Sequence, residues 1–86
     1  MIIKVETVVE DDVMDHFVRI EHAADIQTYN EKYYEIQDEW YAKIPECYGH
    51  HDMLTKFIET LQKYNIDAEN VSYLIDDVVI GFKRNE

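Results

Sequence analysis

Apolar and polar residues alternate at the start of the chain. Residues 2–9 are rich in β-branched types, and the odd positions from Ile3 to Val9 are apolar or threonine, with Lys4 and Glu6 between them. A period of two is typical of a strand with one buried face. We therefore predict a first strand over residues 2–9.

The pattern in residues 13–24 is compatible with a helix or a strand. Val13, Phe17 and Ile20 have helical spacing, and the acidic residues before them suit a helix N-terminus. The segment 17–20 also fits an extended conformation. We favour the helix.

Residues 25–44 carry the clearest helical pattern. Six apolar residues recur at steps of three and four, and on a helical wheel they fill an arc of about 80°. These are Ile26, Tyr29, Tyr33, Ile36, Trp40 and Ile44. Pro45 should end the helix, because the residue before a proline avoids the helical region.

A further helix is expected after a loop over residues 46–51. Asp52 would cap it, and it would run over residues 53–64. Its buried stripe would consist of Leu54, Phe57, Ile58, Leu61 and Tyr64. Asn65 would close it in a left-handed conformation.

The C-terminal residues suggest a hairpin. Residues 71–75 and 78–82 are apolar runs that flank Asp76 and Asp77, and pairing across a two-residue loop places their apolar residues on one face. The simplest assembly is an α+β fold in a single domain, residues 1–86. It has a small three-stranded antiparallel sheet, formed by the N-terminal strand plus the C-terminal hairpin, covered by two or three helices.

The net charge narrows the range of partners. Nineteen acidic residues face eight basic ones in 86 residues, a formal charge of −11. Binding to phosphates depends on lysine and arginine, so we expect no direct contact with nucleic acid or an anionic membrane. A basic protein surface, a cation or plain solubility remain as reasons for the acidity.

The acidic residues concentrate in residues 10–39, which contain ten of them and two bases. These are Glu10, Asp11, Asp12, Asp15, Glu21, Asp25, Glu31, Glu35, Asp38 and Glu39. On the predicted long helix, the acidic residues from Asp25 onward share an arc of about 140° opposite the apolar stripe. Such a face could imitate a row of phosphates and occupy a basic groove; the alternative is a solvated helix face.

In these features the chain resembles small acidic phage-encoded inhibitor proteins, the anti-restriction and anti-CRISPR class that includes DNA mimics. The resemblance rests on composition and on two segments, the acid-rich residues 10–39 and the tyrosine-rich residues 29–34. It implies an inhibitor that blocks the basic DNA- or RNA-binding surface of a host defence or DNA-handling protein. It also implies a location in the host cytoplasm. We further expect a homodimer, because a dimer would extend the acidic surface.

Two tyrosines beside the apolar stripe give a rival interpretation. Tyr34 and Tyr41 lie beside the apolar stripe on the wheel and could contact a partner directly. The protein would then be an adaptor or antitoxin-like interaction protein that binds through aromatic and apolar contacts, with the charge only solvating it. The other possibility is that these rings cover the edge of a small core.

Other chemistries receive little support. Cys47, His50, His51 and Asp52 form a compact group of possible metal ligands, but a structural zinc site usually needs a second pair. A nucleophile pair of Cys47 with His50 or His51 lacks a visible orienting group. We expect no enzyme activity, no metal and no cofactor.

Two further features concern the location. Apolar runs are too short for a membrane span or a signal-peptide core. A single cysteine, Cys47, is typical of a reducing compartment. We therefore expect a cytoplasmic protein.

Overall fold

The chain begins with a β-hairpin. The computed structural model describes residues 1–72 and pairs β1 (Ile2–Val9) with β2 (Asp12–Arg19) along their whole length, in antiparallel orientation. The first strand is therefore confirmed. The helix favoured for residues 13–24 is wrong, since most of that segment is the strand β2.

The burial pattern of β2 explains the error. Its buried residues His16 and Val18, followed by Ile20, repeat every second position, as in a strand. A histidine at the first of these positions disguises the alternation as polar. Pairing with β1 decides the conformation, because strand propensity depends on neighbours more than on local sequence.

A short third strand completes the sheet. β3 (Glu69–Asn70) pairs antiparallel with β2, so that the order is β1-β2-β3 and β1 lies at an edge. The α+β class and the three-stranded antiparallel sheet are confirmed. Two strands come from the N-terminal half instead of one. The predicted hairpin over residues 71–82 lies, beyond Ser72, outside the described residues.

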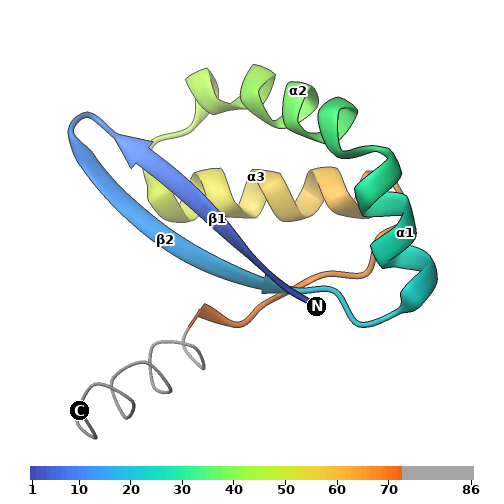
Figure 1. Ribbon diagram of the computed structural model, residues 1–86. Coiled ribbons are helices and arrows are strands. Elements are labelled where there is room, and N and C mark those ends of the chain that lie inside the picture. Colours follow the sequence, from blue (N-terminus) through green and yellow to red (C-terminus); the bar gives the residue numbers. More distant parts are fainter. Residues whose placement is uncertain (73–86) are drawn as a thin grey trace, which may run out of the picture.

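The predicted long helix is divided in two. α1 (Ala23–Glu31) and α2 (Tyr33–Lys43) meet at Lys32, and a 3₁₀ turn (Ile44–Glu46) containing Pro45 ends α2. A straight helix over residues 25–44 would be about 30 Å long, close to the longest dimension of the molecule, 39 Å. α2 packs on α3, and the bend turns α1 away from the direction of α2, as Figure 1 shows.

α3 (His50–Lys63) begins two residues before the predicted cap, and Gly49 occupies the cap position. Asp52 lies in the first turn, where its carboxylate accepts a hydrogen bond from the Tyr48 amide. The C-terminal end agrees with prediction: Asn65 has φ 62°. The amides of Asn65 and Ile66 donate to the carbonyls of Gln62 and Leu61, which is a Schellman motif.

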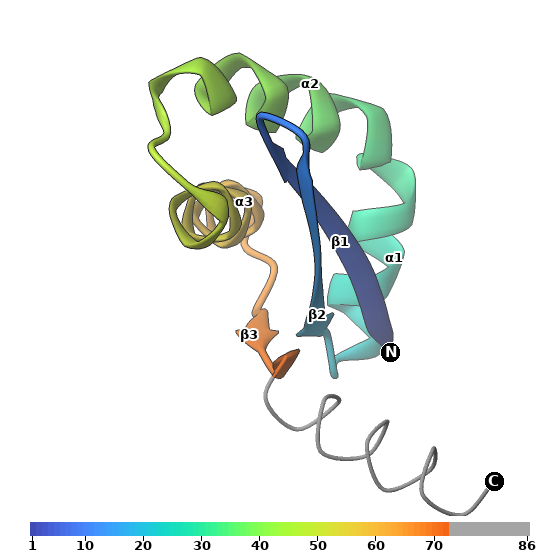
Figure 2. The ribbon, with the colours of Figure 1, turned by 90° about the vertical axis from the view of Figure 1, so that its left-hand side faces the viewer.

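The core lies between the sheet and the helices. α3 packs on β1 and on α2, and both α2 and α3 lie on the same side of the hairpin (Figures 1 and 2). The fully buried side chains include Val18, Ile20, Ile36, Phe57, Leu61 and Ile66. Within residues 1–72, no helix is long and apolar enough to span a membrane.

Candidate functional site

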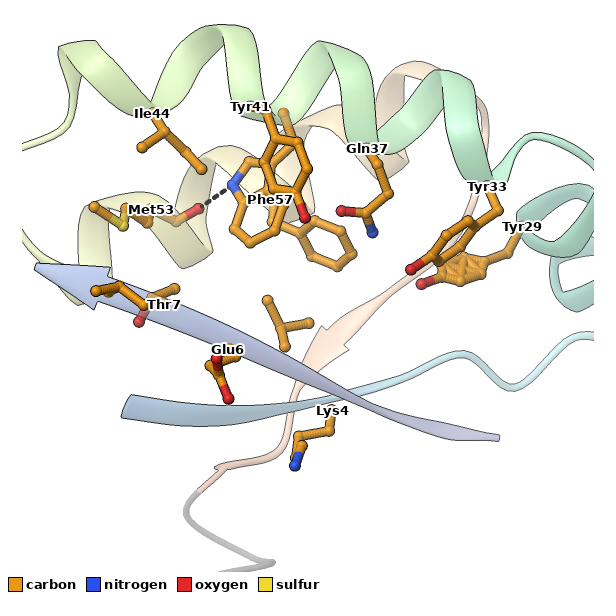
Figure 3. Close-up of a pocket in the computed structure, with 13 residues that line it drawn as sticks. Lys4, Glu6, Thr7, Tyr29, Tyr33, Gln37, Tyr41, Ile44, Met53 and Phe57 are labelled. Carbon is orange, nitrogen blue, oxygen red and sulfur yellow. Dashed lines mark hydrogen bonds between the residues drawn. The ribbon is translucent and has the colours of Figure 1, made fainter. Parts of the chain in front are cut away.

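A groove of about 440 Å³ separates β1 from the helices above it. One wall is the stretch of β1 from Lys4 to Val8, and Met53 and Phe57 of α3 lie at the back. The opposite wall carries residues of α1 and α2 spaced three and four apart, with one more from the turn that follows. These are Tyr29, Tyr33, Gln37, Trp40, Tyr41 and Ile44. Figure 3 shows the aromatic rings facing the strand.

The aromatic stripe of α1 and α2 extends beyond the core, so some of its rings line the groove instead. Tyr29 and Trp40 are buried, and the Trp40 indole donates to the Met53 carbonyl at 2.9 Å. Tyr33 and Tyr41 complete the same wall but stay partly exposed, Tyr41 at 57%. A wall of aromatic rings with accessible edges is typical of contact sites in protein interfaces.

The tyrosine closest to the core stays neutral. Burial, and after it the neighbouring Tyr33, raises the pKa of Tyr29 to about 12. Its ring meets Tyr33 edge to face, with centroids 5.8 Å apart. The Tyr29 ring therefore presents an uncharged aromatic surface at neutral pH.

Only one of the two tyrosines predicted to contact a partner lies in the groove. Tyr41 lines the groove, whereas Tyr34 is 81% exposed and lies outside its lining. The prediction missed Tyr33 and Gln37, and it also missed the edge of β1. The step of four from Tyr29 to Tyr33, Gln37 and Tyr41 was the available signal, but only the position of β1 turns that stripe into a groove.

The predicted acidic face is dispersed by the fold. The bend at Lys32 separates the acidic residues of α1 from those of α2, while the first four of the set lie on the β1–β2 hairpin. Six of the ten have hydrogen-bond or ion-pair partners among the described residues. They are Asp12, Glu21, Asp25, Glu31, Glu35 and Glu39.

Glu39 has two such partners. It accepts hydrogen bonds from the Tyr64 hydroxyl at 2.7 Å and from Lys63 Nζ at 3.1 Å. These two contacts, Tyr64 first, hold the pKa of Glu39 below its ordinary value. Glu39 therefore links α2 to the end of α3. Glu10, Asp11, Asp15 and Asp38 are exposed, and no described residue pairs with them.

A chain of hydrogen bonds, buried between Thr7 and His16 and exposed at Asp12, connects the hairpin to α3. Asp12 Oδ2 lies 2.7 Å from His50 Nε2, and Thr7 Oγ1 lies 2.7 Å from His50 Nδ1 and 2.8 Å from His16 Nε2. If both imidazoles are neutral, the three contacts are satisfied when His16 donates to Thr7, Thr7 to His50, and His50 to Asp12.

This chain has the connectivity of a nucleophile, a base and an orienting carboxylate. Thr7, however, is only 2% exposed, and its oxygen is already bonded to both histidines. A nucleophile must reach its substrate, so we interpret these hydrogen bonds as a structural link between β1, β2 and α3.

The cysteine and histidine group has other partners. His50 bonds to Thr7 and Asp12, Asp52 accepts from the Tyr48 amide, and the Cys47 thiol points to the Lys43 carbonyl at 3.5 Å. Burial, and then the Asp52 carboxylate, raises the pKa of Cys47. Within residues 1–72 no three histidine, cysteine, aspartate or glutamate side chains gather as a metal site.

Comparisons of this chain with models of known protein families, with curated proteins and with solved structures found no match. The function is therefore argued from the geometry of the groove and from the charge around it.

Proposed function

We propose that the protein acts by binding another protein through the groove between β1 and α2. The observation that carries this proposal is the aromatic wall, in which Tyr33 and Tyr41 remain accessible beside a strand edge that no described residue pairs with. Large aromatic rings have few rotatable bonds and lose little conformational entropy on binding, which is one reason why aromatic residues dominate interface energetics.

The charge indicates the kind of partner. With a formal charge of −11, the surface attracts basic proteins and repels acidic ones at the encounter stage. We therefore propose a basic partner, and we place the encounter in the cytoplasm, where a lone thiol such as Cys47 stays reduced. The acidic shell steers the partner, and the groove provides the contacts.

Capture with matched variants tests the proposal. Tagged protein is incubated with nuclease-treated cell lysate, and bound proteins are eluted with a salt gradient. We expect a basic protein that is lost with Tyr41→Ala and retained with Tyr48→Ala, because Tyr48 is 97% exposed and lies outside the groove. Equal retention by both variants would contradict the proposal.

Nucleic-acid mimicry is the second candidate, favoured by the four exposed acidic residues without described partners, Glu10, Asp11, Asp15 and Asp38. In that case the protein inhibits a DNA- or RNA-binding protein by occupying its basic surface, as in the phage-encoded class that it resembles. A homodimer would extend the acidic surface, and sedimentation would show it.

Salt and charge reversal separate the two candidates. Mimicry predicts that Asp11→Lys with Asp38→Lys abolishes inhibition and that binding weakens steeply with salt. Groove binding predicts that Tyr41→Ala has the larger effect and that the complex persists at moderate salt. A complex that survives the double charge reversal unchanged would remove mimicry.

A further inference from the structure

The edge of β1 that faces away from β2, unpaired within residues 1–72, carries a defined set of backbone groups. Met1 and Ile20 exchange hydrogen bonds in both directions, each 2.8 Å long. Hydrogen-bonded pairs alternate along an antiparallel ladder, so the next bonded pairs include Ile3 with Val18 and Val5 with His16. The residues between them direct their amides and carbonyls away from β2, namely Ile2, Lys4, Glu6 and Val8.

The other side of β2 supports this assignment independently. Phe17 is opposite Lys4 and should therefore direct its own backbone groups away from β1. Its carbonyl accepts from the Val71 amide at 2.9 Å, and its amide donates to the Ser72 hydroxyl at 2.9 Å. Both bonds are on the side of β3, as the alternation requires.

No strand among residues 1–72 occupies the free edge of β1. The same stretch, Lys4 to Val8, forms one wall of the groove. A strand laid along this edge would lie beside the groove, with every second side chain directed toward the aromatic wall on α2. The remaining side chains would lie on the opposite face, next to Lys4 and Glu6. Figure 3 shows this relation between β1 and the helical wall.

The exposed face of the hairpin indicates which side chain an added strand would carry at one position. Glu6 and Asp15 are directly opposite each other on β1 and β2, both are exposed, and no described residue pairs with either carboxylate. Like charges directly opposite on neighbouring strands destabilise a sheet. A cation on an added strand beside Glu6 would offset that repulsion.

We propose that β1 accepts an extended segment of the partner as a fourth, antiparallel strand, with a lysine or arginine opposite Glu6. The residues before and after that cation are apolar, because they lie opposite Val5 and Thr7 and point into the groove. This inference rests on the proposed function and adds the form of the bound segment: extended, with a basic residue between two apolar ones. Strand addition at a sheet edge is a recurrent mode of peptide recognition.

Synthetic peptides test the recognition directly. The probe is an acetylated, fluorescently labelled peptide that alternates valine and threonine, with one central threonine replaced by lysine, and its anisotropy is titrated with the whole protein. We expect binding by this valine–lysine peptide and none by its counterpart with glutamate in place of the lysine, the valine–glutamate peptide. Equal binding by the two peptides would overturn the charge assignment.

Backbone methylation tests the strand geometry. N-methylation of alternate peptide residues removes the amide donors of one edge only. One methylated series should lose binding and the other should keep it, since only one edge of the added strand faces β1. Loss in both series or in neither would contradict strand addition.

Hydrogen exchange supplies a readout on the protein itself. In the free protein the amides of Ile2, Lys4, Glu6 and Val8 should exchange rapidly, and the valine–lysine peptide should protect all four. The amides of Ile3, Val5 and Thr7 should be protected in both states. Binding without this alternating change would place the peptide elsewhere and overturn the proposal.

Charge reversal at Glu6 completes the test. Glu6→Lys should weaken binding of the valine–lysine peptide about tenfold or more and create binding of the valine–glutamate peptide. Glu59→Lys, on the exposed side of α3, makes the same change in net charge and should affect neither peptide. If the peptides fail while Tyr41→Ala still abolishes capture from lysate, the groove function stands and strand addition is wrong.

Discussion

Thr7 links three elements through a single hydroxyl group. It bonds to His16 on β2 and to His50 on α3, and it is 2% exposed. Thr7→Val keeps the shape of the side chain but leaves the facing nitrogens of both histidines without this partner. We expect a loss of about 1–3 kcal/mol in the free energy of unfolding, the usual cost of unsatisfied buried polar groups, measured by urea denaturation.

Thr55→Val is the matched control for that measurement. Thr55 is exposed on α3, where its hydroxyl bonds to the His51 carbonyl, and water can replace this contact. A change within about 0.5 kcal/mol is expected there. Equal losses of unfolding free energy at the two positions would mean that the hydrogen bonds of Thr7 add nothing specific to stability.

Cys47 provides a pH-dependent test at the residue scale. Burial and the Asp52 carboxylate raise the pKa of its thiol, so less thiolate is present at a given pH than in a free cysteine. Asp52→Asn keeps an acceptor for the Tyr48 amide and removes the charge. The midpoint of the pH profile of iodoacetamide alkylation should move to lower pH.

Glu46→Gln is the comparison for Cys47, since Glu46 contributes least of the named groups to the pKa of the thiol. Its alkylation midpoint should move less than that of Asp52→Asn. A midpoint that does not move in Asp52→Asn would show that burial alone sets the pKa.

The β1–β2 hairpin contains a strained residue at its turn. Glu10 has φ 56°, a left-handed conformation that costs a residue with a Cβ roughly 1–2 kcal/mol. Glycine adopts it freely. Glu10→Gly should therefore stabilise the protein by up to about 1 kcal/mol after the greater chain entropy of glycine is subtracted, measured as a higher urea midpoint.

Asp11→Gly serves as the control in the same turn. Asp11 is not in the left-handed region, so glycine brings only its entropic cost, and the urea midpoint should fall or stay unchanged. A rise in both variants would trace the effect to the removal of an acidic charge instead of the backbone.

At the level of elements, the features that could be predicted from the sequence are those that depend on a single local pattern. The strand over residues 2–9, the helix before Pro45 and the left-handed Asn65 each depend on a short periodicity or a single residue, and all three are present. The bend at Lys32 could not be predicted in this way, because no glycine or proline marks it and the helical bonds continue on both sides. The bend is a tertiary feature, since α2 packs on α3.

The groove belongs to the whole molecule, which is why sequence analysis found Tyr41 but not the site. Its aromatic wall is visible as a helical stripe, but the other wall requires β1 to be an edge strand. That depends on β2 lying between β1 and β3, and the predicted sheet lacked β2. The single acidic arc on the helical wheel assumed one straight helix, whereas the structure divides these residues between α1 and α2.

Net charge supplies the last prediction, which concerns the stability of the whole chain. A formal charge of −11 opposes compaction by self-repulsion, and added salt screens that repulsion. Exposed ion pairs such as Lys32–Glu35 lose a little under the same conditions, but each contributes only about 0–1 kcal/mol. The repulsion dominates, so Tm should rise by several degrees when NaCl is increased from about 20 mM to about 500 mM.

Glu6→Gln should have a higher Tm at low salt and a smaller rise with salt, because it removes the pair of like charges with Asp15. A Tm that falls with salt would show that the paired acidic residues outweigh the net charge, and attraction of a basic partner would then have to come from local carboxylates such as Glu6 and Asp15.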